Sequence, residues 1–342
     1  MGLKVIANAG DTTGLKVPKG IITEVGGEVL FTGCTTEDDF IEKARDASAV
    51  IMFFIAFRMN AKIMDNLPKL RHICNTGVGY DGVDLLEASE RGIAVTNNPY
   101  YCLDEVSTQA FTLLMALSRN IFQIKNAVKE GSWGGSDPKL RSNIFPHINR
   151  INGQTLGIVG LGNIGRTLVS KARGCGMKVI AYDPYVAEAI MCNQFGVEKV
   201  SFEDLLQRSD YISIHAKLTD ETNKMFKSEQ FRMMKPTAYL INTARGPIVD
   251  EVALTEALTK GWISGAGLDV SEFEPIKPGN PLLAMDNVIV TGHTAFYSNE
   301  SQDDLWQTAF KNVALSIQSK FPDYCVNPEV EKEWLKRWSS SK

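Results

Sequence analysis

The stretch Thr155–Arg166, TLGIVGLGNIGR, decides the fold of this 342-residue chain. Its apolar run TLGIV predicts a buried β-strand, and Gly160, Gly162 and Gly165 then spell Gly-x-Gly-x-x-Gly. The first glycine permits a tight turn, the second lets the backbone approach a pyrophosphate, and the third lets helix and strand pack closely. A helix beginning near Asn163 would offer its free N–H groups and positive dipole end to phosphates.

An acidic residue ends the next predicted strand, as a dinucleotide site requires. Asp183 closes the run KVIAYD, about 20 residues after the glycines. Its carboxylate would accept hydrogen bonds from ribose hydroxyls and repel a 2′-phosphate, so we expect NAD, with NADH preferred over NADPH. Asn163 and Ile164 begin the helix and are expected to line the same site. The alternative is a plain strand–helix turn.

A second Gly-x-Gly-x-x-Gly occupies Gly77–Gly82, again between a predicted strand and a helix. The following strand ends in Asn97 and Asn98, with no acid, so we do not expect a dinucleotide here. A glycine-rich loop can still present backbone N–H groups to a smaller anion such as a substrate carboxylate. Val78 and Gly79 are the expected donors.

Short apolar runs alternate with helical segments along the chain, which is typical of parallel sheets covered by helices. Five predicted strands precede residue 100: Leu3–Ala7, Glu28–Phe31, Ala49–Phe54, Arg71–Asn75 and Ile93–Asn97. Six more follow: Leu156–Val159, Val179–Tyr182, Tyr211–Ala216, Tyr239–Thr243, Gly265–Val270 and Val288–Thr291.

The segment that joins the two series predicts one long helix from Asp104, as its N-cap, to about Lys129. The stretch 131–149 is rich in Gly, Ser, Pro and Asn and is interpreted as a loop. A last helix over about 300–319 precedes a polar tail and is expected to pack on the first domain. The predicted domains are therefore 1–103 with 300–342, and 104–299.

Polar side chains stand at the carboxyl ends of the later strands, where open parallel sheets bind ligands. They are Asp183, His215, the run Asn242–Gly246, Asp269 and His293. Packing gives an apolar strand no reason to end repeatedly in such groups. Their clustering on one edge is the strongest chemical signal in the chain.

The sequence pattern does not assign individual roles to these residues. The rigid fork of Arg245 suits a carboxylate, although a structural ion pair is the alternative. His293 and His215 compete for acid–base work near neutral pH. Glu272 and Glu274 compete for the carboxylate that would hold the histidine. Asp269 would act on the cofactor or cap a loop.

Composition excludes several classes of function. With 36 Lys and Arg against 40 Asp and Glu, the net charge is −4, which provides no electrostatic footprint for nucleic acid or an anionic membrane surface. The longest uncharged apolar run, 47–57, is too short to cross a bilayer. The six cysteines are scattered without zinc spacing, so we expect reduced thiols, no metal and a cytoplasmic protein.

Taken together, these motifs resemble the D-isomer-specific 2-hydroxyacid dehydrogenases over nearly the whole chain. The motifs are GVGYDGVD (77–84), TLGIVGLGNIGR (155–166), AYDPY (181–185), INTARGPIVDE (241–251), GAGLDVSEFEP (265–275) and GHTAFYS (292–298). Within the family, the stretches YDPY, NTARG and HTAFYS also resemble those of C-terminal-binding-protein corepressors and D-lactate dehydrogenases. The resemblance implies an α/β fold of two doubly wound parallel-sheet domains, a Rossmann NAD domain and a flavodoxin-like substrate domain, with a cleft between them.

The resemblance also implies roles. Arg245 would bind the substrate carboxylate and polarise its ketone, His293 would protonate the developing alkoxide, and Glu274 rather than Glu272 would keep that histidine charged. The other residues implied at the cofactor are His215, Thr243, Ala244 and Asp269. Gly292 replaces the family's usual proline and Ser271 its usual aromatic.

The implied function is an NAD-dependent reductase of 2-oxo acids that works as a homodimer. An NADH-sensing, corepressor-like binding protein is the alternative, and a relative acting on formate or phosphite is a third possibility. Phe54, Ile55, Tyr100, Tyr101 and Phe296 would form an apolar pocket, or else pack in the core. The pocket would favour 2-oxo acids with apolar or aromatic side chains over glyoxylate or oxaloacetate.

Overall fold

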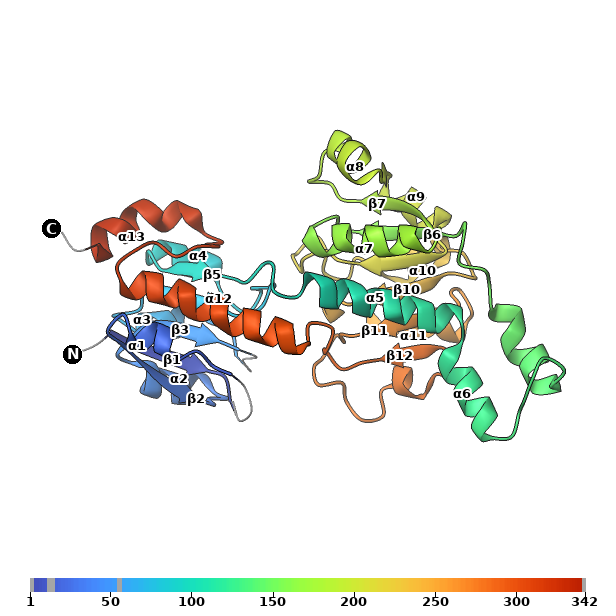
Figure 1. The fold of residues 1–342 in the computed structure, drawn as a ribbon, viewed down its shortest axis with the longest axis horizontal. Helices are drawn as coiled ribbons and strands as arrows, with labels where there is room; N and C mark the ends of the chain where they lie inside the picture. The colour runs from blue at the N-terminus through green and yellow to red at the C-terminus, as the bar shows by residue number, and fades with distance from the viewer. Residues whose placement is uncertain (1–2, 11–15, 54–56, 340–342) are drawn as a thin grey trace. The chain divides into compact units, whose positions relative to one another are not determined.

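The computed structural model describes residues 3–10, 16–53 and 57–339. The chain divides into two compact units. The first unit joins Met1–Tyr101 to Ser298–Lys342, and the second unit comprises Cys102–Tyr297. Figure 1 shows how the C-terminal helices, in red, lie with the N-terminal strands in blue.

A parallel five-stranded sheet in the order β2-β1-β3-β4-β5 forms the centre of the first unit. Its strands are β1 (Leu3–Asn8), β2 (Gly27–Thr32), β3 (Ala47–Met52), β4 (His72–Asn75) and β5 (Ala94–Thr96). Every residue of β3 is buried, which explains its uninterrupted apolar sequence. All five strands predicted for this region are present, with ends that differ by one or two residues in the described chain.

Helices cover both faces of this sheet. They are α1 (Gly20–Thr23), α2 (Glu37–Ala44), α3 (Ala61–Asp65), α4 (Leu85–Glu90), α12 (Asn299–Ile317) and α13 (Glu331–Trp338), with a 3₁₀ turn at Pro328–Val330. The expected last helix is α12, which packs on β3 and β4. The expectation of a polar tail after it is wrong, because α13 buries Trp334 and its indole N–H donates to the Arg71 carbonyl at 2.7 Å.

The second unit contains a parallel seven-stranded sheet in the order β12-β11-β10-β9-β6-β7-β8. Its strands are β6 (Thr155–Val159), β7 (Lys178–Tyr182), β8 (Glu198–Lys199), β9 (Tyr211–Ile214), β10 (Tyr239–Asn242), β11 (Gly265–Leu268) and β12 (Val288–Val290). Six of them were predicted. The edge strand β8 escaped prediction because two residues are too few to carry an apolar pattern.

The helices of the second unit are α5 (Leu103–Ser118), α6 (Ile121–Lys129), α7 (Asn163–Gly174), α8 (Glu188–Phe195), α9 (Phe202–Arg208), α10 (Ser228–Met233) and α11 (Glu251–Thr259). The single helix expected from Asp104 to Lys129 is wrong, because Asn120 adopts a left-handed φ of 48° and separates α5 from α6. Asp104 is not the N-cap either. It lies in the first turn of α5 and pairs with Lys171 at 2.6 Å.

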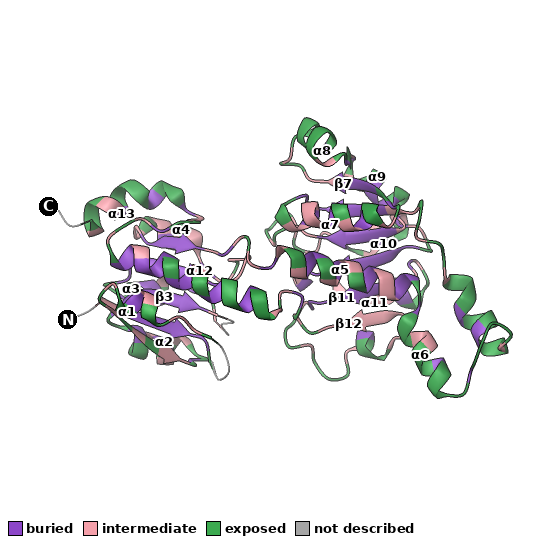
Figure 2. Cartoon of the chain, viewed as in Figure 1, coloured by how far each residue is buried: buried purple, intermediate pink, exposed green. Residues whose placement is uncertain are grey.

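The loop expected over 131–149 also contains regular structure, a π-helical turn at Leu140–Ile144 and a 3₁₀ turn at Phe145–His147. Two further 3₁₀ turns lie at Gly246–Ile248 and Pro281–Ala284. Figure 2 shows that buried residues concentrate in the strands and on the helix faces that cover them. Among the described residues, no helix is both long enough and apolar enough to span a bilayer.

Candidate active site

The carboxyl ends of the parallel strands in the second unit gather most of the predicted site residues along one sheet edge. Gly160 follows β6, Asp183 follows β7, and His215 follows β9. The run Thr243–Arg245 follows β10 and Asp269 follows β11, both directly, and His293 comes three residues after β12.

The glycine turn after β6 has the close contacts that its sequence predicts. Gly160 has φ +90°, and a Cβ there would lie 2.8 Å from the backbone nitrogen of Ala216. A Cβ on Gly165 would lie 2.5 Å from the Gly160 carbonyl oxygen. Only glycine fits at these two positions, because backbone atoms rather than mobile side chains occupy the space.

Gly162 differs from its two neighbours because it faces open space. A Cβ there would meet nothing within 4 Å. It is the N-cap of α7 and provides no side-chain acceptor for the first N–H groups of that helix. Asn163 and Ile164 follow in the first turn. An open helix N-terminus behind a glycine turn fits a dinucleotide pyrophosphate.

Two further features of this sheet edge also fit a bound dinucleotide. The hydroxyl of Thr243 is buried and has no hydrogen-bond partner within the described chain. The Asp183 carboxylate accepts backbone N–H groups of Leu161 at 2.9 Å, Tyr185 at 2.9 Å and Val186 at 3.2 Å. These bonds fix the carboxylate beside the glycine turn, and its two oxygens retain lone pairs for hydroxyl donors.

His293 and Glu274 form the shortest contact between titratable groups at this edge. His293 Nδ1 lies 2.6 Å from Glu274 Oε2, and both side chains are partly exposed. Glu274 Oε1 accepts the Ser271 N–H at 3.2 Å. Burial acts to raise the pKa of Glu274, but the hydrogen bond and charge of His293, the Ser271 N–H and the charge of Arg245 together lower it below its usual value.

The backbone of His293 is held in an unusual conformation by Asp269. Gly292 and His293 have successive left-handed φ values of 67° and 58°. The buried Asp269 carboxylate accepts the N–H groups of Thr294 at 3.0 Å and Ala295 at 2.9 Å, and its carbonyl accepts the His293 N–H. Asp269 therefore acts as the loop cap that the sequence left as one alternative. Glycine in place of the family's proline suits this conformation.

Arg245 stands on a loop braced from β10 and packed against the Glu274 segment. The Asn242 side chain donates to the Arg245 carbonyl at 2.9 Å and accepts the Ala244 N–H at 3.0 Å. A Cβ on Gly246 would lie only 1.9 Å from the Ser271 carbonyl oxygen. The two loops therefore touch backbone to backbone, and Arg245 is close enough for its charge to lower the pKa of Glu274.

Glu272 is held away from the histidine by other partners. It lies 3.1 Å from Lys224 Nζ, and its carboxylate accepts the Glu251 N–H at 3.3 Å. Its own N–H donates to Glu251 at 2.5 Å. The structure thus brings Glu274, and not Glu272, to His293.

The other histidines have separate surroundings. His215 Nε2 bonds the Ser213 hydroxyl at 2.8 Å, and burial lowers its pKa to about 4. His72, buried in the first unit, lies between the hydroxyls of Ser316 and Thr96, and burial followed by the charge of Arg71 lowers its pKa to about 3. His215 remains at the sheet edge, beside the Gly160 turn.

The glycine loop of the first unit, Gly77–Gly82, is oriented by two asparagines that sequence reasoning did not select. The Asn75 amide donates to the Gly77 carbonyl at 3.0 Å and the Gly79 carbonyl at 2.8 Å, while Asn97 donates to the Val78 carbonyl at 2.7 Å. In a trans peptide each N–H opposes the preceding carbonyl, so the N–H groups of Val78 and Gly79 point away from these amides. Within the described chain these two N–H groups have no acceptor. Asparagine at a strand end beside a glycine run was the available sequence signal.

Contacts among the described residues do not bring the expected apolar pocket together. Phe54 and Ile55 lie outside the described residues. Tyr100 packs edge-on against Tyr324 at 5.7 Å, and Tyr101 packs against the core of the first unit. Phe296 lies edge-on to the His293 ring at 6.5 Å. The bulky pocket therefore stays a prediction.

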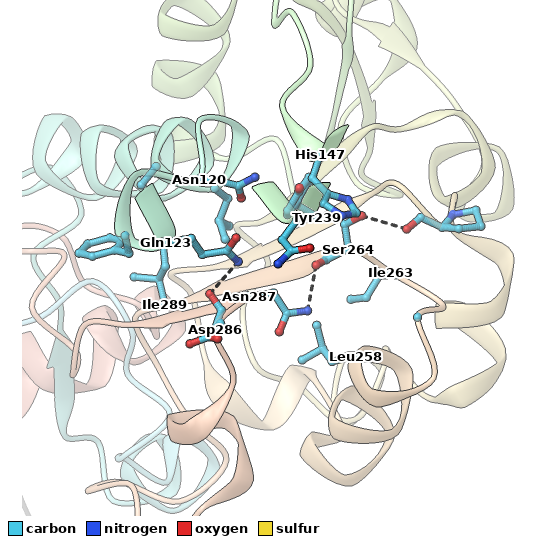
Figure 3. A pocket seen from close by; sticks show the side chains of 16 residues that line it. Asn120, Gln123, His147, Tyr239, Leu258, Ile263, Ser264, Asp286, Asn287 and Ile289 are labelled. Carbon is cyan, nitrogen blue, oxygen red and sulfur yellow. Dashed lines mark hydrogen bonds between the residues drawn. The ribbon is translucent and has the colours of Figure 1, made fainter. Parts of the chain in front are cut away.

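A cavity of about 390 Å³ lies at the opposite, amino-terminal side of the second sheet (Figure 3). Tyr239, Ser264 and Asn287 line it at the starts of β10, β11 and β12, with His147 from the 3₁₀ turn. Because it faces the amino ends of the strands, it is distinct from the edge that carries Arg245 and His293. No group of three His, Cys, Asp or Glu side chains suited to a metal ion is found in the described part of the chain.

Comparison with known proteins agrees with this geometry. The family model for the D-isomer specific 2-hydroxyacid dehydrogenase NAD-binding domain matches residues 111–295. A glyoxylate reductase of Korarchaeum cryptofilum is 39% identical over 292 residues, which cover 85% of this chain and 86% of that protein.

Solved structures of similar proteins cover nearly the whole chain. D-mandelate dehydrogenase of Rhodotorula graminis has a TM-score of 0.83 at 28% identity, over 95% of this chain and 98% of its own. D-lactate dehydrogenase with NAD+ from Lactobacillus jensenii has a TM-score of 0.76 at 26% identity, over 95% and 99%.

Proposed function

The chain belongs to the D-isomer-specific 2-hydroxyacid dehydrogenase family, and from this premise we propose that it reduces glyoxylate, or a 2-oxo acid of similar size, with NADH. Members of this family are oxidoreductases that act on the CH–OH group of 2-hydroxy acids with a nicotinamide cofactor. This chain is therefore an oxidoreductase of that class. Glyoxylate is proposed because it names the activity of the relative that is 39% identical. The preference for bulky apolar substrates is the competing prediction.

The residues at the carboxyl edge of the second unit would hold the dinucleotide. Gly160, Gly162 and Gly165 would receive the pyrophosphate at the N-terminus of α7, with Asn163, Ile164, Thr243, Ala244 and His215 along the edge. Asp183 would accept the ribose hydroxyls. Arg166 does not compensate a 2′-phosphate, because its Nε donates to the Leu161 carbonyl at 2.9 Å and its guanidinium stacks 4.9 Å from the Phe195 ring. These features support NADH over NADPH.

The substrate would be bound by complementary groups. The N–H groups of Val78 and Gly79 suit a carboxylate, because no acceptor within the described chain uses them. Arg245 would bind the carboxylate and polarise the ketone through its guanidinium. Phe296, beside the imidazole, would limit the space at C2.

Proton transfer follows from the His293–Glu274 pair. When bound, the nicotinamide supplies the hydride that C2 of the 2-oxo acid accepts. His293 Nδ1 is engaged by Glu274 at 2.6 Å, so its other ring nitrogen, Nε2, would deliver the proton to the substrate oxygen. Glu274 would stabilise the imidazolium before transfer and orient the ring. Asp269 keeps the histidine loop in place through its buried carboxylate.

The single observation that supports this function best is the 2.6 Å His293–Glu274 contact beside Arg245. Oxidation of NADH in the presence of glyoxylate tests it directly. His293→Ala should lower kcat by on the order of 1,000-fold, within the range for a general acid, and leave NADH affinity nearly unchanged. His215→Ala should be much milder. If His215→Ala proves the more damaging change, the assignment of the acid is wrong.

A panel of 2-oxo acids separates the two substrate predictions. Higher kcat/KM for glyoxylate than for phenylpyruvate supports the small substrate, and the reverse order supports an apolar pocket. An absence of turnover with NADH retained in binding would favour the corepressor-like alternative.

We propose in addition that the protein is a cytoplasmic homodimer. The six cysteines are free thiols, which suits a reducing compartment. Light scattering at micromolar concentration measures the mass directly, and a value near that of one 37.7 kDa chain would contradict the dimer.

A further inference from the structure

Helix α12 lies along the sheet of the first unit. Its N-terminal end lies nearer to the carboxyl edge of that sheet, the side at which the parallel strands end. Near the end of the helix, the Ser316 hydroxyl lies 3.1 Å from His72 Nδ1, at the start of β4. One-third of the way along, the Leu305 carbonyl accepts from the Asn98 side chain at 3.4 Å, just beyond the end of β5. The first turn of α12 therefore lies at the carboxyl edge.

Gln302 stands in that first turn, on the face that packs on the sheet. It precedes Leu305 by three residues and Trp306 by four, and side chains at these spacings share one helix face. Leu305 and Trp306 are each 1% exposed, and Gln302 is 6% exposed. Because helical side chains lean towards the N-terminus, the Gln302 amide leans further towards the carboxyl edge.

The amide of Gln302 is buried without a partner. Its Nε2 has no hydrogen-bond acceptor within the described chain, and neither does the indole nitrogen of Trp306 one turn later. Two buried donors therefore share one helix face, and residues 3–10, 16–53 and 57–339 offer neither of them an acceptor. Burying a donor that has no acceptor costs free energy, so we expect each of these two donors to bind an acceptor from outside the described residues.

Two hydrogen bonds of Asn98 connect this part of α12 to the glycine loop Gly77–Gly82. The Asn98 N–H donates to the Gly77 carbonyl at 3.0 Å, while its side chain holds the Leu305 carbonyl. Gln302 is thus three residues before Leu305, whose carbonyl binds Asn98, the residue that anchors the loop. The loop directs the N–H groups of Val78 and Gly79 outward from the same edge.

We propose that Gln302 is a substrate-binding residue whose side-chain amide donates a hydrogen bond to a carboxylate oxygen of the 2-oxo acid. The inference rests on the proposed function, because it takes the substrate from it. The substrate carboxylate oxygen would supply the acceptor that the described residues do not provide for Gln302, alongside the backbone N–H groups of Val78 and Gly79. Gln302 would therefore set substrate affinity rather than the rate of hydride transfer.

Gln302→Met is the decisive variant because it keeps the length of the side chain and removes the amide. We expect KM for glyoxylate to rise about 10-fold, with kcat within about twofold and NADH affinity unchanged. Thermal stability should hold or increase, because an orphaned buried amide is replaced by an apolar group. A structural glutamine would show the opposite pattern, with lower stability and unchanged KM.

Gln154→Met is the matched control. The Gln154 amide oxygen is also buried without a partner in the described chain, but the residue precedes β6 at the amino side of the second sheet. This variant should leave KM for glyoxylate unchanged. If both variants raise KM equally, or if Gln302→Met leaves KM unchanged, the inference is overturned and an ordered water becomes the better occupant.

Gln302→Glu adds a pH readout that packing alone would not produce. An ionised carboxylate there would repel the substrate carboxylate, so KM should exceed that of Gln302→Met at neutral pH and fall as acid protonates the new side chain. A KM ratio between the two variants that does not change with pH would count against the contact.

Binding of oxamate, a non-reacting 2-oxo acid mimic, to the NADH-loaded protein separates the two hypotheses. If the wild type binds oxamate without turning over any 2-oxo acid, and Gln302→Met weakens that binding about 10-fold, the proposed function fails and the Gln302 contact stands. Turnover by the wild type with equal oxamate affinity in both proteins overturns the contact alone. Absence of both turnover and oxamate binding overturns both.

Discussion

The two Gly-x-Gly-x-x-Gly loops of this chain share a spelling but differ in the backbone that they build. In the loop after β6, Gly160 has φ +90° and Gly165 leaves no room for a Cβ beside the Gly160 carbonyl. In the loop after β4, a Cβ on Gly77 would meet its nearest atom, Asn75 Nδ2, at an ordinary 3.7 Å. Close packing therefore requires glycine at positions 160 and 165 of the first loop, whereas it does not require glycine at position 77 of the second.

The helices that follow the loops differ as well. The 12-residue α7 begins at Asn163, within the motif Gly160–Gly165, and its N-cap Gly162 provides no side-chain acceptor. After Gly82 the chain takes two more residues to reach α4, and Asp84 caps that six-residue helix by accepting the Glu87 N–H at 3.3 Å. An uncapped long helix suits a pyrophosphate, while the second loop offers only its own backbone N–H groups.

The residues around a glycine motif therefore determine which ligand the motif is suited to bind. An open helix terminus and Asp183 favour a dinucleotide at the first loop. Three inward carbonyls, held by Asn75 and Asn97, favour a small anion at the second. Substitutions in the two loops should therefore change different measured quantities.

The largest effect is expected at Gly160. Gly160→Ala would place a Cβ 2.8 Å from the Ala216 nitrogen and require a left-handed alanine, at a cost of about 2–4 kcal/mol. A turn displaced to relieve this clash would no longer fit the pyrophosphate, so the Kd for NADH should rise on the order of 100-fold. Fluorescence titration with NADH measures it. Gly77→Ala is the control and should change NADH affinity less than about twofold, so equal losses in the two variants would abolish the distinction.

Asp183 should set the choice of cofactor. The wild type is expected to use NADH with kcat/KM at least about 30-fold above NADPH, because the 2′-phosphate would meet a carboxylate. Asp183→Asn keeps the shape and removes the charge, so the ratio should fall by about 10-fold. Steady-state kinetics with both cofactors measures this ratio. Equal efficiency in the wild type would contradict the assignment of Asp183.

Asn75 should act on the substrate and not on the cofactor. Asn75→Ala removes the donors to the Gly77 and Gly79 carbonyls, worth about 1–2 kcal/mol, and releases the loop. KM for glyoxylate should rise about 10-fold while NADH affinity stays constant. Asn66→Ala, at an exposed amide that donates to the Lys62 carbonyl, is the matched control. A change in NADH affinity in Asn75→Ala would contradict the assignment of the two loops to different ligands.

Glu274 lies outside both loops and should alter neither affinity. Its pKa is lower than usual, so its carboxylate stays charged through mildly acidic pH and reduction keeps its rate there. Below that range Glu274 takes up a proton and loses its charge, so reduction by the wild type should slow there. In Glu274→Gln the imidazolium has no charge partner at any pH, so kcat should be about 10-fold lower at neutral pH and should lack the decline that protonation of Glu274 causes. An unchanged kcat in steady-state kinetics across this pH range would remove Glu274 from the proton step.

The layers of the fold follow from the sequence pattern, because apolar runs alternating with helical periodicity leave few arrangements other than covered parallel sheets. Gly160, Gly165 and Asp183 were also accessible, since a tight turn and an acid at the next strand end are local requirements. The break at Asn120 was not, because a single left-handed residue leaves the helical periodicity on either side intact.

Which polar groups meet depends on the tertiary structure. Sequence spacing left Glu272 and Glu274 equivalent, and only the family resemblance favoured Glu274. The fold gives the physical reason, because Glu272 pairs with Lys224 and Glu251 while Glu274 reaches His293. Gln302 gave no signal as a lone amide in an amphipathic helix. Gln302 becomes a candidate because α12 packs on the N-terminal sheet more than 200 residues after β5. No local sequence pattern predicts that contact. Local chemistry is written in short stretches, whereas the partners of a side chain depend on where distant strands and helices end.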